Sequence, residues 1–191
     1  NGLKVGNPLD PQTVIGPMSH SVHGERVLGY IRSAVEAGAR VVCGGERAVV
    51  PGCEGGFFVQ PTVLADCNNH MKAVREEIFG PVLCVIKYSD EAQAIAIAND
   101  SDYGLSAGVW TGDVLAAQSI ARRLRAGSVW INDWHMLRSD VPFGGFKQSG
   151  TGREFGVAGL EAFLETKAIS TAFQRDPAKK QMTYGIVHKP S

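Results

Sequence analysis

The alternation of short apolar runs with helix-length segments in the second half of the chain constrains the fold most. The expected elements are a strand at 82–86, a helix at 91–99, a strand at 105–111, a helix beginning at 112–113 and a strand at 128–131. Strands that alternate with helices of this length pair in parallel through right-handed crossovers. We therefore expect an α/β fold, built as a parallel sheet with helices on both faces.

The first eighty residues carry similar local signals. Residues 20–37 have apolar side chains at helical spacing, and Gly38 ends the predicted helix. Residues 39–43 form a short β-branched run that predicts a strand. A further strand is predicted over residues 57–64, but Pro61 inside it indicates an edge position or an interruption, because proline cannot donate to a strand ladder.

The segment after the last predicted strand is the first candidate for a binding site. In open α/β sheets ligands bind beyond the carboxyl ends of the strands. Residues 132–152 follow such an end and are rich in glycine and proline. The segment also concentrates polar and aromatic side chains: Asp133, Trp134, His135, Met136 and Arg138. This concentration is unusual for a simple connector and favours a functional role.

Charge and cysteine content argue against several classes of protein. Nineteen Lys and Arg residues balance nineteen Asp and Glu residues, so no electrostatic footprint for nucleic acid or an anionic membrane is expected. The four cysteines form no Cys-x-x-Cys pair, and we predict no metal site. No secretory signal and no membrane-length apolar run is present, which predicts a cytoplasmic location.

Several motifs together resemble one protein family. They are Glu76-Glu77-Ile78-Phe79-Gly80-Pro81-Val82, Tyr103-Gly104-Leu105, Gly127-Ser128-Val129-Trp130-Ile131-Asn132, Pro142-Phe143-Gly144-Gly145-Phe146-Lys147-Gln148-Ser149-Gly150 and Arg153-Glu154. In order and spacing they resemble the later signatures of the aldehyde dehydrogenase superfamily. The resemblance covers about residues 5–170. It implies a partial catalytic domain over 1–152 and a terminal helix and oligomerisation strand over 153–174. The composition of residues 175–191 predicts a polar tail.

The resemblance implies that Glu77 binds the nicotinamide ribose and that Phe79 packs near the nicotinamide ring of NAD or NADP in the full-length enzyme. A carboxylate that accepts from two vicinal hydroxyls fixes the ribose and orients the ring for hydride transfer. Without the resemblance, a Glu-Glu pair before a strand is more often a solvated surface. The sequence does not choose between NAD and NADP.

The resemblance also implies a substrate tunnel along residues 134–137, with Asn132 at the strand end that leads into it. We take Asn132, Trp134 and Leu137 as candidate substrate-binding residues. Trp134 at the rim, covering apolar surface, is the simpler alternative. A tryptophan there is compatible with a cationic aldehyde such as betaine aldehyde, although one wall does not define the substrate. His135 is assigned no chemistry.

The family's nucleophile, in a Gly-Gln-x-Cys context, and its general base, in Glu-Leu-Gly-Gly, do not occur in these residues. No catalytic residue is therefore assigned, and we expect the chain alone to be an inactive fragment of an enzyme that oxidises a small aldehyde to a carboxylate. Two alternatives stay open: a noncatalytic assembly module of the same fold, and a related CoA-acylating reductase. Residues 166–173 predict a marginal strand that pairs with a neighbouring chain, or else folds back on its own chain or frays. The resemblance implies a homodimer or homotetramer.

Overall fold

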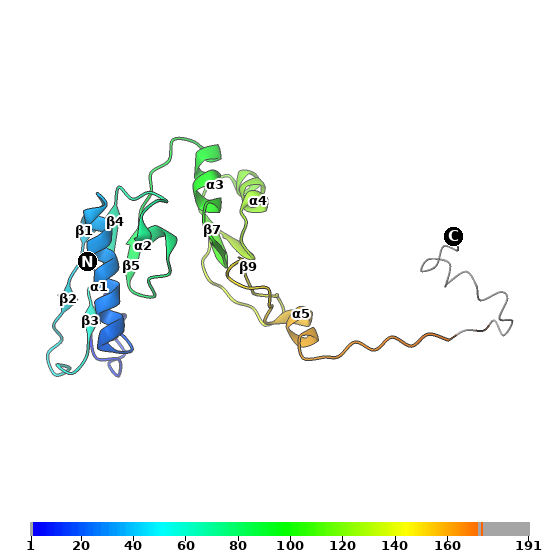
Figure 1. The fold of residues 1–191 in the computed structure, drawn as a ribbon, viewed down its shortest axis with the longest axis horizontal. Coiled ribbons are helices and arrows are strands. Elements are labelled where there is room, and N and C mark those ends of the chain that lie inside the picture. The colour runs from blue at the N-terminus through cyan, green and yellow to red at the C-terminus, as the bar shows by residue number, and fades with distance from the viewer. Residues whose placement is uncertain (1, 172, 174–191) are drawn as a thin grey trace, which may run out of the picture.

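The structure is a computed structural model that describes residues 2–171 and 173, and its elements form two groups along the chain (Figure 1). The first group contains α1 (Ser21–Glu36), β1 (Arg40–Cys43), β2 (Arg47–Ala48), β3 (Phe58–Val59), β4 (Thr62–Ala65), α2 (Lys72–Arg75) and β5 (Val82–Cys84). The second group contains α3 (Glu91–Asn99), β6 (Tyr103–Gly104), β7 (Ser106–Val109), α4 (Val114–Arg123), β8 (Ser128–Ile131), β9 (Phe146–Lys147) and α5 (Gly156–Glu161).

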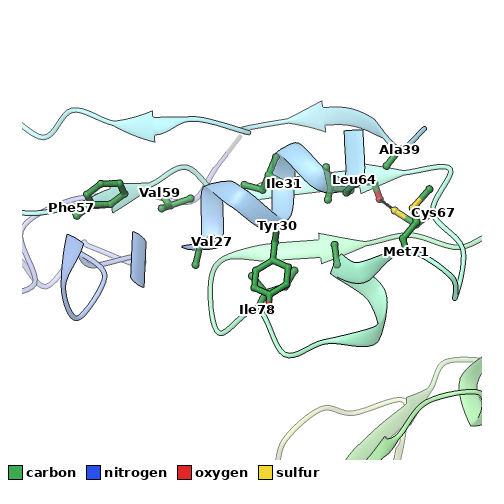
Figure 2. Close-up of a cluster of buried hydrophobic side chains, with 12 residues drawn as sticks. Val27, Tyr30, Ile31, Ala39, Phe57, Val59, Leu64, Cys67, Met71 and Ile78 are labelled. Carbon is green, nitrogen blue, oxygen red and sulfur yellow. Dashed lines mark hydrogen bonds between the residues drawn. The ribbon is translucent and has the colours of Figure 1, made fainter. Parts of the chain in front are cut away.

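Helix α1 supplies much of the core of the first group. His20 caps its first turn, where the ring Nδ1 accepts a hydrogen bond from the amide of His23 at 3.1 Å. Its buried side chains recur at helical spacing and lie against β3, β4 and α2 (Figure 2). The helix ends at Glu36, and Gly38 adopts the left-handed backbone conformation that reverses the chain. The helix predicted over residues 20–37 is confirmed.

The first group is organised around a sheet with strand order β1-β4-β5. Strand β4 pairs in parallel with β5, whereas β1 pairs with β4 antiparallel. Leu64 on β4 is completely buried on the face covered by α1, and Cys84 opposite it packs against the same core. The alternate residue Leu83 is 60% exposed on the other face. Among the described residues, therefore, helices cover one face of this sheet.

Pro61 divides the strand that was predicted over residues 57–64. Strand β3 before it pairs with β2, and β4 after it joins the other sheet. Thr62 stabilises the place where the chain passes from one sheet to the other. Its buried hydroxyl donates to the carbonyl of Gln60 at 2.7 Å and accepts from the amide of Gly45 at 2.9 Å. The predicted interruption at the proline is confirmed.

The second group contains the crossover expected from the sequence. Strands β7 and β8 pair in parallel from Ser106 opposite Ser128 to Val109 opposite Ile131, and α4 connects them. The α/β class is thus confirmed. The strands do not form one continuous parallel sheet in the described part of the chain, since β5 pairs with β4 and not with β7. Helix-strand alternation predicts parallel pairing but does not choose the partner of each strand.

Polar side chains join the two groups. Asn69 donates from Nδ2 to the carbonyl of Ile97 at 2.9 Å. The guanidinium of Arg75 contacts the carboxylates of Asp100 and Asp102 at 3.0 and 3.3 Å. These contacts link the loop before α2 and α2 itself to the end of α3.

The end of the described chain differs from the expectation. Helix α5 ends at Glu161, and residues 164–171 and 173 are exposed and form no strand in this single chain. A strand needs a hydrogen-bonding partner, and none of the described strands offers this segment one. The predicted polar tail, 175–191, lies outside the described residues, and the domain boundary after residue 152 stays a prediction. None of the helices described is long and apolar enough to cross a membrane.

Candidate cofactor and substrate site

The two glutamates before β5 have different surroundings. The hydroxyl of Tyr30 donates to Glu76 Oε2 at 2.7 Å, and the ammonium of Lys72 lies 4.0 Å from the same oxygen. Glu77 is exposed, and no described side chain or backbone group forms a hydrogen bond or ion pair with its carboxylate. Glu76 is therefore held by the protein, while the Glu77 carboxylate is available to a ligand.

The two residues that follow repeat this alternation. Ile78 is only 9% exposed and belongs to the core, whereas the side chain of Phe79 is 71% exposed. Phe79 has a φ of 50°, in the left-handed region that residues other than glycine rarely occupy. Its carbonyl oxygen lies 2.7 Å from Nε2 of His23 on α1. The loop thus presents an exposed carboxylate and an exposed aromatic ring two residues apart.

Glu77, together with Glu76, lines a cleft of about 330 Å³ between the two groups of elements. Its walls include Arg75, Ser101, Tyr103, Arg125 and Ser149. Phe79 does not line this cleft. A carboxylate at a polar cleft next to an exposed ring suits a ligand that combines hydroxyl groups with a flat ring, because the hydroxyls donate to the carboxylate and the ring packs on the aromatic face.

The loop after β8 places the predicted substrate residues in different settings. Asn132, with a φ of 53°, exchanges two hydrogen bonds of 2.9 Å with the backbone of Thr111, so its amide already has a structural partner. Trp134 is 52% exposed and lies in an aromatic cluster, with its ring centroid 5.5 Å from that of Trp130 and 6.4 Å from that of Trp110. The aromatic cluster forms a partly exposed surface.

Leu137 lines a separate cavity of about 380 Å³ with Met136, Arg138 and Phe143. Trp130 forms the boundary between this cavity and the aromatic cluster, since its Nε1 donates to the carbonyl of Met136 at 3.3 Å. This cavity and the cleft lined by Glu77 have no lining residue in common. The structure therefore gives the two predicted regions as separate surfaces.

The half-buried thiol of Cys84 has no nucleophilic character at neutral pH. Burial raises the pKa of the Cys84 thiol to about 12, and the neighbouring Cys67 adds to the shift. A thiol with such a pKa stays protonated at neutral pH, and the thiolate is the reactive form. Across the residues that the structure describes, no group of three His, Cys, Asp or Glu side chains is arranged to hold a metal ion.

Comparison with known proteins gives the family. The family model described as "Aldehyde dehydrogenase family" matches residues 1–169. The chain belongs to the aldehyde dehydrogenase family. It is 44% identical over 167 residues to the betaine aldehyde dehydrogenase of Mesorhizobium japonicum, and this match covers 87% of the chain and 34% of the relative.

Solved aldehyde dehydrogenase structures agree with the fold. The betaine aldehyde dehydrogenase of Staphylococcus aureus in complex with NAD+ matches with a TM-score of 0.83 and 42% identity, covering 86% of this chain and 33% of the other. An aldehyde dehydrogenase of Mycobacterium tuberculosis complexed with NAD+ matches with a TM-score of 0.80 and 51% identity, covering 84% and 33%. The chain thus spans about a third of the length of these aldehyde dehydrogenases.

Sequence reasoning missed the residues of α1 that contact the loop before β5. Tyr30 lies 46 residues from Glu76, and His23 lies 56 residues from Phe79. The only local signal was the helical spacing of these side chains with Val27. That spacing predicts a buried helix face but does not indicate which segment packs against it.

Proposed function

We propose that this chain is the second part of the catalytic domain of an NAD(P)-dependent aldehyde dehydrogenase, which oxidises an aldehyde to a carboxylate. The observation that carries the proposal is the contrast between Glu76 and Glu77. Both glutamates are exposed and line the same polar cleft, but Glu76 is bonded to Tyr30 and lies near Lys72, whereas the Glu77 carboxylate has no described partner. Two glutamates with purely structural roles would not need to differ in their hydrogen-bond partners.

The residues present fit a nicotinamide dinucleotide. Bound NAD(P)+ would supply the hydride acceptor of the reaction. Glu77 would accept hydrogen bonds from the two hydroxyls of the nicotinamide ribose, and the exposed ring of Phe79 would pack near the nicotinamide. These contacts would fix the ring relative to the aldehyde, and correct orientation is a large part of the catalytic effect in such reactions. The NAD+ complexes of the related structures support this assignment.

The proposed substrate is a small aldehyde. Trp134 in the aromatic cluster and Leu137 in its own cavity would each offer it an apolar surface, and Asn132 would shape the entrance through its bonds to Thr111. The aromatic cluster would attract a cationic group, because the face of an indole ring is electron-rich. This feature, together with relatives named betaine aldehyde dehydrogenases, supports betaine aldehyde as a first compound to assay.

The proposed assembly is a homodimer or homotetramer in the cytoplasm. The segment that leaves α5 carries exposed apolar side chains, among them Phe163, Ile169 and Phe173, at 89%, 84% and 92%. Such side chains together with unpaired backbone groups are suited to contact with a second chain. The four free cysteines support the location.

The cofactor role is tested by comparing Glu77→Gln with Glu76→Gln in the full-length enzyme. We expect Glu77→Gln to slow hydride transfer by up to about a hundredfold with little change in melting temperature, because the ring is no longer oriented. We expect Glu76→Gln to lower the melting temperature, since Glu76 is bonded within the protein. Unchanged single-turnover rates for Glu77→Gln would show that the ribose assignment is wrong.

A further inference from the structure

We infer that one face of α1 positions the cofactor loop, residues 76–80, and that His23 is the residue that fixes Phe79. The inference rests on the proposed role of Glu77 and Phe79 in binding the cofactor. His23 and Tyr30 themselves do not contact the ligand in this scheme. They act through the loop and are positioning residues.

The contacts between α1 and the loop follow one stripe of the helix. His23, Val27 and Tyr30 are separated by four and three residues, which places them on the same side of an α-helix. Tyr30 bonds Glu76 at the start of the loop, and His23 lies at hydrogen-bond distance from the carbonyl of Phe79 near its end. The helix therefore holds the loop at both ends.

Close packing fixes the loop between these two hydrogen bonds. Val27 is completely buried, and a Cβ atom added to Gly80 would come within 2.7 Å of its methyl groups. Ile78 is buried in the same core cluster as Val27 and Tyr30, as Figure 2 shows. The loop has little room to shift along the helix.

The bond to His23 stabilises an unfavourable backbone conformation. A φ of 50° at Phe79 costs free energy for a residue with a side chain, and such a conformation persists only where surrounding contacts hold it. A carbonyl oxygen can only accept, so Nε2 of His23 carries the hydrogen in this contact of 2.7 Å. Without this donor, Phe79 is expected to relax toward an ordinary backbone angle.

The position of the loop matters because it carries both proposed ligand contacts. Glu76 accepts from Tyr30 on α1 and Ile78 is buried in the core, while the side chains of Glu77 and Phe79 are exposed. A change in the backbone at Phe79 would reorient both exposed side chains relative to each other. A ribose and a nicotinamide ring bound to them would then lose their mutual alignment.

His20 provides a matched control on the same helix. Its ring lies 6.0 Å from that of His23 and accepts from the amide of His23, but it makes no described contact with the loop. Asparagine at position 20 retains a cap acceptor. His20→Asn therefore changes a histidine at the same helix end and leaves the loop contact intact.

The experiment compares His23→Leu, His23→Gln and His20→Asn in the full-length enzyme. His23→Leu is expected to raise the Kd for NAD+ and to lower kcat, each by about tenfold, the scale of one lost hydrogen bond. His23→Gln, which retains an N–H donor, should restore both values to within about twofold. In the ligand-free enzyme, amide hydrogen exchange of residues 77–80 should become about tenfold faster in His23→Leu and stay unchanged in His20→Asn.

Glu77→Gln separates this inference from the proposed function. Normal NAD+ binding and turnover in Glu77→Gln would show that the cofactor role is wrong, whatever His23 does. If Glu77→Gln impairs binding while His23→Leu changes neither Kd, kcat nor exchange, the positioning role of His23 is wrong. Should His23→Leu fail to fold, Tyr30→Phe removes the bonds of the hydroxyl to Glu76 and Arg26, of which only the first reaches the loop, and must accelerate exchange at residues 76–78; unchanged exchange would overturn the inference.

Discussion

The side-chain amide of Asn132 bonds to both backbone polar groups of Thr111. Its Oδ1 accepts from the amide of Thr111, and its Nδ2 donates to the carbonyl, each at 2.9 Å. The backbone amide of Asn132 also donates to the carbonyl of Val109 at 2.9 Å. Asn132 thus continues the pairing of β7 and β8 with its side chain, beyond the last backbone hydrogen bond between the two strands.

Asn132→Ala is expected to lower the free energy of unfolding by about 2–3 kcal/mol. The two side-chain bonds contribute about 1 kcal/mol each, and alanine is disfavoured at a φ of 53°. Asn132→Gly removes the same bonds without the backbone penalty and should cost less. Denaturant unfolding measures both values. Equal losses for the two variants would contradict the backbone part of this account, and a change confined to the KM for aldehyde would favour direct substrate contact.

Gly80→Ala is expected to lower the free energy of unfolding by about 1–3 kcal/mol, as overpacked cores do. The new Cβ atom would lie 2.7 Å from the methyl groups of Val27, which is completely buried. Gly112→Ala is the control, because a Cβ atom there meets nothing within 4 Å. Thermal or denaturant unfolding tests the pair. Equal stability of the two variants would show that the loop is not closely packed on α1.

Cys84 predicts a loss of stability at high pH. Burial, followed by the effect of Cys67, raises the pKa of the thiol from 9.0 to about 12 in the folded protein. Between these values the unfolded chain loses a proton that the folded chain keeps, so the free energy of unfolding falls as the pH rises from about 9 to about 12. Cys84→Val should show a smaller decrease over this range. Identical pH profiles for the two proteins would exclude this contribution.

The 191-residue chain alone is expected to form no NADH from an aldehyde and NAD+. The sequence has no cysteine in the family's nucleophile context, and the thiol of Cys84 stays protonated at neutral pH. An absorbance assay on the purified chain tests this expectation. Turnover that survives removal of contaminating enzyme and is lost on changing Cys43, Cys53, Cys67 or Cys84 would contradict it.

Removal of residues 166–191 from the full-length enzyme is expected to reduce the number of subunits in the oligomer. Light scattering measures the mass, and circular dichroism must show that both forms are folded. Ile169→Asp should weaken assembly, while Val49→Asp should not, although these two side chains are similarly exposed at 84% and 87%. An unchanged oligomer after truncation would refute the assembly role.

Local patterns predicted much of the fold because the signals were themselves local. The helix ending before Gly38, the break at Pro61 and the parallel pair joined by α4 all follow from spacing and from residues with restricted backbones. The sheet partner of β5 was not predictable, since several strands of similar composition satisfy the same pattern. The strand predicted at residues 166–173 depends on a partner that local sequence cannot supply.

The candidate site was only partly predictable for a similar reason. Family motifs pointed to Glu77 and Phe79, but the different surroundings of Glu76 and Glu77 depend on Tyr30, which lies far away in sequence. The separation of Leu137 and Trp134 into different surfaces depends on how the side chain of Trp130 lies between them. Neither relationship has a local sequence signal.

The junction between the two groups of elements has a consequence for how the chain opens. Asn69 and Arg75 connect the groups through exposed or partly exposed polar contacts, and no strand ladder crosses the junction in the described part of the chain. Salt screens such ion pairs, whereas the apolar core beneath α1 is insensitive to moderate ionic strength. We therefore expect the two groups to unfold as separate cooperative units, with the second unit opening at higher ionic strength while the first remains protected.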